Sequence, residues 1–159
     1  MRTWMMTAGL TAFALISSVT VHAAESDRHY VAAPTPAAGG AAPPFSEAIL
    51  VNGTLYVAGH IGMDPATQQA ATDVDAEAHL VLDAVKKTVE EAGLSMDDLV
   101  SVTVYCTDLK LYDGFNAIYR SYFHGQFPTR AFIGVSQLVR GAHFEISGIA
   151  VAHRTKRHH

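Results

Sequence analysis

Two isolated charges lie in two otherwise apolar, strand-like segments near the C-terminal end of the chain. Arg130 is the only charge in residues 129–135, and Glu145 is the only carboxylate in residues 142–151. Charged side chains are rarely buried unless they are paired or bind something. An arginine offers a planar fork that fits a carboxylate, and a glutamate can hold and polarise a water. Arg130 and Glu145 are therefore candidate site residues, unless they pair with each other or lie in water at strand ends.

A metal site is another use that these side chains would allow. His143 stands two residues before Glu145 on the same face of the expected strand, and His60 belongs to an earlier strand. Zinc sites need three or four protein ligands, and no clear further ligand accompanies these residues. We therefore predict no metal and interpret His60 and His143 as rim residues of their strands.

The elements that must position these residues follow from turn residues and periodicity. Asn52-Gly53 predicts a two-residue hairpin turn, because both positions of such a turn need positive φ. Thr72-x-x-Asp75 has the form of a capping box that opens a helix, and Gly93 is expected to stop that helix. The expected strands are residues 29–32, 46–51, 54–59, 99–107, 129–135 and 142–151.

Two helix-like segments accompany the strands. Apolar residues recur at three- and four-residue steps over residues 74–92, and a second apolar stripe over residues 115–122 ends near Gly125. Two helices cover only one face of a sheet, and the uncovered face would mix polar and apolar residues. Such a face favours a subunit interface, although an open solvated sheet is the alternative. The apolar face of the strand at 99–107 is expected to consist of Val100, Val102, Val104 and Cys106.

Composition indicates one compact domain with a real core. The chain has 159 residues, of which 49% are hydrophobic and 16% are charged, and its formal net charge is −4. A mildly acidic chain lacks the electrostatic footprint of a nucleic-acid-binding protein. Cys106 is the single cysteine, so it is expected to be a small core residue and forms no intramolecular disulfide.

The first 23 residues have the pattern of a cleaved signal peptide. Arg2 precedes a short uncharged stretch over residues 5–18, and Val21-His22-Ala23 offers small residues at a cleavage site. We expect an extended lead-in over residues 24–44 and a domain over residues 45–152, with a first strand near 29–32. A basic tail is expected at residues 153–159. The mature protein would be periplasmic or secreted, with no membrane association after cleavage.

Six short motifs occur in an order and spacing that resemble the Rid/YjgF family of reactive-intermediate deaminases, over roughly residues 29–152. The motifs are Phe45-Ser46-Glu47-Ala48, Gly59-His60-Ile61-Gly62, Asp108-Leu109, Phe115-Asn116-x-x-Tyr119, Phe127-Pro128-x-Arg130 and Phe144-Glu145-Ile146. The resemblance implies an α+β fold, with a chorismate-mutase-like mixed β-sheet and two helices packed on one face. It also implies a homotrimer with a barrel-like core and ligand clefts between adjacent subunits.

The resemblance further implies hydrolysis of 2-imino acids and their enamine tautomers to 2-oxo acids and ammonia, without a cofactor. Arg130 would grip the substrate carboxylate, and Glu145 would position the attacking water. Backbone groups near Gly59 and Phe132 would complete the substrate site. Asn116 matches an asparagine of the family's second helix, which we interpret as an architectural cap or an interface residue.

Three positions depart from the family pattern. Phe45 stands where tyrosine is usual, Phe132 stands where cysteine is frequent, and Ala58-Gly59-His60 replaces Ser-Gly-Gln. Phe132 is expected to narrow or reshape the pocket, and Phe45 removes a hydroxyl group from the substrate site. A non-catalytic protein that binds small carboxylates in an intersubunit cleft is therefore the alternative function. Endoribonuclease activity, attributed to some relatives, fits poorly with an acidic, exported protein.

Overall fold

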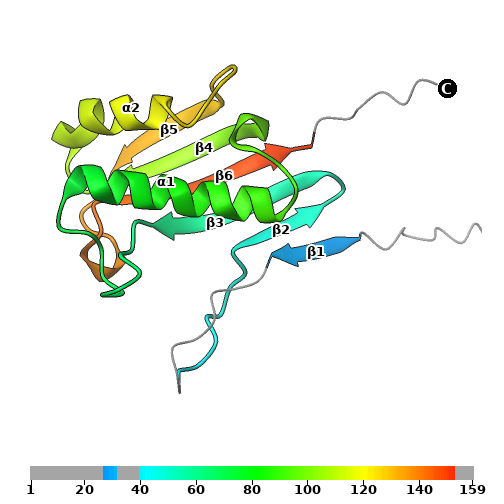
Figure 1. Cartoon of the computed structure of the whole chain (residues 1–159), viewed down its shortest axis with the longest axis horizontal. Coiled ribbons are helices and arrows are strands. Elements are labelled where there is room, and N and C mark those ends of the chain that lie inside the picture. Colours follow the sequence, from blue (N-terminus) through cyan, green and yellow to red (C-terminus); the bar gives the residue numbers. More distant parts are fainter. Residues whose placement is uncertain (1–26, 32–39, 153–159) are drawn as a thin grey trace, which may run out of the picture.

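One six-stranded mixed sheet carries both helices on a single face, as expected for this α+β fold (Figure 1). The computed structural model describes residues 27–31 and 40–152, so the expected signal peptide, most of the lead-in and the basic tail lie outside the described residues. The strands follow the order β1-β2-β3-β6-β4-β5, and only β4 and β5 pair in parallel. They are β1 (Arg28–Val31), β2 (Ala48–Val51), β3 (Thr54–Ile61), β4 (Leu99–Cys106), β5 (Thr129–Gly134) and β6 (Phe144–Val151).

The hairpin between β2 and β3 has the predicted turn. Asn52 and Gly53 both have positive φ, at 51° and 78°, which matches the right-handed twist of the flanking strands. This register brings Val51 opposite Thr54 and Ala48 opposite Val57. The hairpin therefore fixes which residues of β3 face the helices.

The first helix, α1 (Val74–Glu91), begins one residue later than the capping-box prediction requires. The predicted cap at Thr72 is wrong, because the side chain of Asp73 accepts a hydrogen bond from the Ala76 N–H at 2.8 Å. Gly93 follows the helix with φ of 78°, as expected for a helix stop. Acidic residues in the first turn, Asp75 and Glu77, suit the positive end of the helix dipole.

The second helix, α2 (Tyr112–Arg120), ends earlier than the predicted stop near Gly125. Asp97 Oδ1 accepts hydrogen bonds from the main-chain N–H groups of His124 and Gly125, at 2.9 and 3.3 Å. These N–H groups therefore bond outside the helix, and the chain turns away toward β5.

A β-bulge at the start of β4 corrects the predicted apolar face of that strand. Leu99 pairs with Ala150 and Ser101 pairs with Ile149, so Val100 is the extra residue. Leu99 is buried, whereas Val100 is 46% exposed. The bulge shifts the alternation by one position, and Val102, Val104 and Cys106 then face the core as predicted.

The core lies between the helices and one face of the sheet. Leu82 and Val85 of α1 and Phe115 of α2 pack there against Val104 and Ile146. The opposite face carries half-buried residues, which include Ser101, Thr103, Tyr105, Ser147 and Ile149. Among the described residues, no helix is long and apolar enough to cross a membrane.

Candidate functional site

The Arg130 side chain lies at the edge of the sheet, on the side that carries α2. Its Nη2 donates a hydrogen bond to Asn116 Oδ1 at 2.6 Å. Its guanidinium carbon lies 4.5 Å from the ring centroid of Tyr119 and 5.6 Å from that of Phe132, within cation–π range. No carboxylate lies within ion-pair distance of Arg130 among residues 27–31 and 40–152. The guanidinium is therefore held in place by neutral groups and keeps its charge for another partner.

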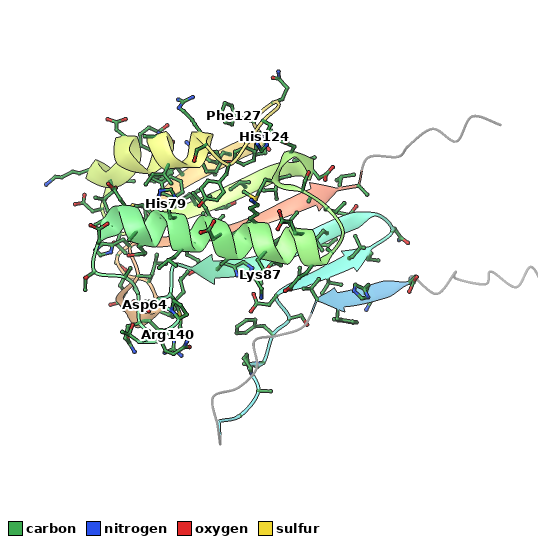
Figure 2. All side chains as sticks on the ribbon, viewed as in Figure 1. Asp64, His79, Lys87, His124, Phe127 and Arg140 are labelled. Carbon is green, nitrogen blue, oxygen red and sulfur yellow. The ribbon has the colours of Figure 1, made fainter. Side chains whose placement is uncertain are left out.

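A hollow of about 280 Å³ opens beside this guanidinium. Tyr119, which contributes to its wall, has a pKa raised by burial to about 12, so its phenol stays neutral. Phe127 lies in the loop between α2 and β5 and is 50% exposed at the rim (Figure 2). The hollow is lined by Asn116, Tyr119, Arg120, Phe127, Pro128 and Arg130. Its size and its two cationic groups, Arg120 and Arg130, suit a small carboxylate.

The Glu145 carboxylate lies directly over Gly59 on the other face of the sheet. A Cβ atom at Gly59 would collide with Glu145 Oε1, so only glycine leaves room for this carboxylate. Glu145 pairs in register with Ile61 of β3 and with Tyr105 of β4. It has no ion-pair partner within the part of the chain that the structure describes.

Strand register places Arg130 and Glu145 on opposite faces of the sheet. Arg130 pairs with Val102, whose side chain is buried beneath the helices. Glu145 pairs with Tyr105, three residues further along β4 and therefore on the other face. The two charges do not pair with each other in one chain, which removes that alternative for both of them.

Of the other predicted site residues, Phe132 lies near Arg130 and Phe45 lies near Gly59. Phe132 pairs with Val104 and lies beside Arg130, where its ring packs edge-on against Tyr112 at 4.9 Å between centroids. Phe132 is not among the residues that line the hollow, and its expected effect on an intersubunit pocket stays a prediction. Phe45 is 52% exposed and precedes Glu47, whose carbonyl accepts from the Ala58 N–H. Phe45 is therefore at the Gly59 end of β3.

His60 is not the expected rim residue, whereas His143 is partly exposed just before the start of β6. His60 is 8% exposed beneath α1, with Nδ1 3.1 Å from Glu47 Oε2. Burial, and then the positive charge of Lys87, lower the pKa of His60 to about 4. His143 is half-exposed, but its Nδ1 lies 2.7 Å from Glu77 Oε2. Within the described residues, no three histidine, cysteine, aspartate or glutamate side chains gather as a metal site would require.

Sequence reasoning missed two of these partners. Asn116 accepts a hydrogen bond from Arg130 and is not the N-cap of α2, which is Leu111; its interpretation as an interface residue stays a prediction. Glu77 is fully buried, although it stands next to Ala78 in a stripe that reads as apolar. The only available indication was a lone carboxylate beside the core-facing stripe of a helix, and such a residue is ordinarily solvent-exposed.

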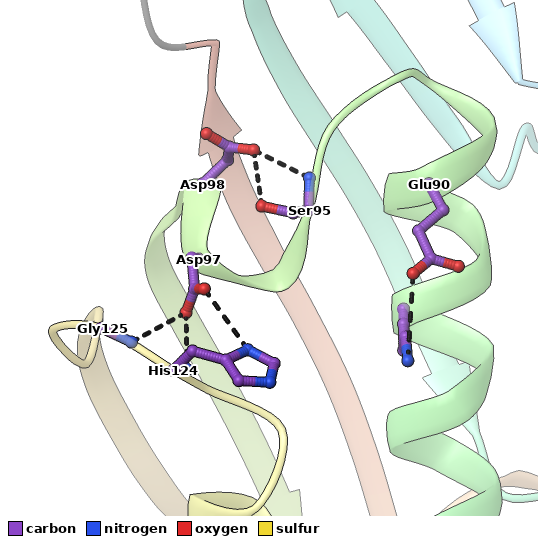
Figure 3. Close-up of polar contacts among 7 residues, drawn as sticks. Glu90, Ser95, Asp97, Asp98, His124 and Gly125 are labelled. Carbon is purple, nitrogen blue, oxygen red and sulfur yellow. Dashed lines mark hydrogen bonds and ion pairs between the residues drawn. The ribbon is translucent and has the colours of Figure 1, made fainter.

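A second hollow, of about 350 Å³, lies on the outer side of the helices near the turn at residues 95–98. Figure 3 shows that its polar groups bind one another. Asp97 accepts from the His124 and Gly125 N–H groups and lies 3.5 Å from His124 Nδ1. The first of these hydrogen bonds lowers the pKa of Asp97. Because these groups are already engaged with each other, the hollow is a weaker candidate than the one beside Arg130.

Comparisons with known proteins agree with the fold. A family model described as Endoribonuclease L-PSP matches residues 35–152. The human 2-iminobutanoate/2-iminopropanoate deaminase is 36% identical over 118 residues, which cover 74% of this chain and 86% of the human protein. A RutC family protein of Sulfurisphaera tokodaii is 37% identical over 107 residues, which cover 67% of this chain and 86% of that protein.

A solved structure of E. coli TdcF with bound serine superposes with a TM-score of 0.67 and 32% identity, and the match covers 72% of this chain and 92% of that one. Both the sequence matches and this structural match span most of the described fold. The chain therefore belongs to the Endoribonuclease L-PSP family, which is the Rid/YjgF family that its ordered motifs resemble.

Proposed function

We propose that this protein hydrolyses 2-imino acids and their enamine tautomers to 2-oxo acids and ammonia, in a cleft between two subunits. The observation that carries the proposal is that the Arg130 guanidinium is oriented beside a small hollow and has no acidic partner among the described residues. Relatives named 2-iminobutanoate/2-iminopropanoate deaminase support the same reaction.

In the proposed reaction, the guanidinium of Arg130 binds the substrate carboxylate through two parallel hydrogen bonds. Glu145 accepts a proton from a water molecule as the water oxygen bonds to the imine carbon, and it passes this proton to the imine nitrogen, which gives a carbinolamine. Glu145 then moves the hydroxyl proton of the carbinolamine to the amino group, so that the carbon–nitrogen bond breaks, ammonia leaves and the 2-oxo acid remains. An imine carbon is already electrophilic, so orientation and a positioned base suffice.

The opposite faces of Arg130 and Glu145 support a site that needs two copies of the chain. A substrate with three or four carbon atoms cannot touch both side chains within one subunit, because the sheet separates them. The Glu145 face is mixed and carries no helix (Figure 1). We propose that a homotrimer forms through this face, so that Glu145 of one copy reaches the hollow beside Arg130 of the next. Light scattering should give a mass close to three chains.

The direct test is the release of ammonia and 2-oxo acid from 2-iminopropanoate that an amino acid oxidase generates in the same tube. Addition of this protein should accelerate hydrolysis over buffer and over heat-denatured protein. If the protein binds 2-oxo acids but gives no acceleration, the deaminase proposal is wrong and a carboxylate-binding function replaces it. This test separates the two functions because Phe45 lacks the hydroxyl group of the family's usual tyrosine, which is one reason why a carboxylate-binding protein without turnover is the alternative.

A further inference from the structure

A buried carboxylate holds the beginning of the strand that carries Glu145. Glu77, in the first turn of α1, is fully buried. Its Oε1 accepts hydrogen bonds from the main-chain N–H groups of His143 and Phe144, at 2.6 and 2.9 Å. Its Oε2 lies 2.7 Å from Nδ1 of the His143 ring. The Glu77 side chain therefore binds two main-chain N–H groups and one ring nitrogen, all of which belong to His143 and Phe144. Glu145 is the next residue in the chain.

The arrangement depends on where β3 ends. Ile61, the last residue of β3, pairs with Glu145, and Gly62 follows it. A Cβ atom at Gly62 would collide with the backbone carbonyl and the Cγ of Glu77. Glycine at this position therefore allows the first turn of α1 to pack closely against the segment that follows β3. Beyond Ile61 the strand no longer pairs with β6, and the Glu77 carboxylate supplies the acceptors for the N–H groups of His143 and Phe144.

This anchoring acts on Glu145 through the main chain. Glu145 has partners for its backbone in Ile61 and Tyr105, but no side chain among the described residues pairs with its carboxylate. The carboxylate must nevertheless stay over Gly59 to hold a water at a fixed place. A shift of about 1 Å in such a group can lower a rate by about a hundredfold.

We infer that Glu77 and His143 form a positioning pair for Glu145, which fixes the start of β6 and thereby the place of the base. The inference rests on the proposed function. The buried carboxylate accepts the Nδ1–H of His143 and so sets the tautomer of that ring, whose other side reaches solvent. Neither residue touches the substrate; both act through the backbone of Glu145.

The test compares kcat, KM and 2-oxo acid affinity in the parent and in Glu77→Ala. Activity is expressed per binding site, titrated with pyruvate, so that a loss of folded protein does not count as a loss of catalysis. Glu77→Ala should lower kcat by about ten- to a hundredfold and leave pyruvate affinity within about twofold, because Arg130 lies on the other face. Glu77→Gln retains one oxygen for both N–H groups and should recover kcat to within about threefold of the parent.

Glu90→Ala is the matched control, since Glu90 is an exposed carboxylate on the same helix, and it should keep the parent's kcat. If Glu77→Ala does not fold, His143→Ala keeps both main-chain hydrogen bonds and should lower kcat by about three- to tenfold at unchanged affinity. If the parent is active and the folded Glu77→Ala or His143→Ala variant is equally active, the positioning role is wrong, while the proposed function stands. A parent without turnover would overturn the proposed function, and this inference with it.

Discussion

At the scale of single residues, Arg130 combines a fixed position with an unneutralised charge. A neutral amide and three aromatic rings orient its guanidinium. Asn116 Oδ1 lies 2.6 Å from Nη2, and the rings are those of Tyr112, Tyr119 and Phe132. A carboxylate partner in the same chain would have competed with a ligand for the guanidinium fork. The observed partners therefore orient the fork and take one hydrogen bond from its Nη2, but they place no negative charge on it, as expected for a carboxylate-binding site.

Replacing Arg130 by lysine tests whether this geometry matters beyond charge. Arg130→Lys keeps the positive charge but loses the planar fork, so pyruvate binding should weaken by about 1.5–3 kcal/mol. Isothermal titration calorimetry measures the difference. Arg140→Lys is the control, because Arg140 is exposed and donates only to the Gln68 carbonyl. Equal affinities in the parent and Arg130→Lys would remove Arg130 from the ligand site.

Glu145→Gln tests the proposed base. The amide is nearly isosteric and fits over Gly59, but it does not accept a proton from water. Hydrolysis of 2-iminopropanoate should fall by roughly 10²-fold or more, with pyruvate affinity largely unchanged. Stopped-flow measurement of imine decay gives the rate. A Glu145→Gln variant as fast as the parent would show that Glu145 has a structural role only.

Sequence reasoning found these two residues but not their separation. Each stood out as a lone charge in an apolar strand, which is visible without a structure. Their strands are consecutive in the chain and would be expected to neighbour each other, yet β4 lies between β5 and β6. The face of each side chain depends on that strand order and on the parallel pairing of β4 with β5, which periodicity alone does not reveal.

At the scale of elements, the local sequence predicted which helices, strands and turns form better than it predicted strand pairing and the exact first residue of a helix. The Asn52-Gly53 turn was predictable because its backbone conformation demands those residues. The bulge at Val100 was not, because an extra residue in a strand follows from pairing with β6. The observed cap of α1, Asp73, is one residue after the predicted cap, Thr72. Both residue types are good caps, so the local sequence does not distinguish them and tertiary packing decides which one caps the helix.

The packing of α1 over β3 makes the stability of the fold depend on pH through His60. Lys87 lies on the side of α1 toward β2 and β3 (Figure 2), and His60 is buried beneath the helix. Burial and Lys87 lower the pKa of His60 from 6.5 to about 4. The unfolded chain therefore binds a proton near pH 6.5 that the folded protein does not bind until about pH 4. The free energy of unfolding falls as the pH falls through this window.

His60→Gln should remove this dependence, because glutamine does not titrate. Between pH 7 and pH 4, the parent should lose about 3 kcal/mol more unfolding free energy than the variant. Urea denaturation at several pH values measures the difference, and His29→Gln on the exposed strand β1 serves as the control. Parallel pH curves for the parent and His60→Gln would show that His60 is not the group responsible.

At the scale of the whole molecule, the first 23 residues have the pattern of a cleaved export signal, from which we predict export. Removal of residues 1–23 takes away Arg2 and no acidic residue, so the formal charge would change from −4 to −5. We expect mature protein to begin at Ala24 and to be recovered outside the cytoplasm. Intact-mass analysis of natively exported protein checks the cleavage point. Retention of Met1 in that protein would contradict the prediction of a signal peptide.

Assembly is the other property of the whole molecule, and the proposed site depends on it because Arg130 and Glu145 lie on opposite faces of the sheet. Gly59 and Glu145 lie together on one face, whereas Arg130 lies with Asn116 on the other side of the sheet. One complete site then requires one half from each of two copies. Two variants that are inactive for different reasons should therefore complement each other when they assemble together.

The most direct measurement mixes Arg130→Ala with Glu145→Gln, unfolds both in denaturant, and refolds them as one population. In a homotrimer, roughly a quarter of the sites should then combine an intact Arg130 with an intact Glu145, so hydrolysis of 2-iminopropanoate should recover to about a quarter of the refolded parent. Each variant refolded alone should stay inactive. If the mixture forms mixed trimers and remains as inactive as its components, while the refolded parent is active, the two residues do not meet across subunits and the proposed site is wrong.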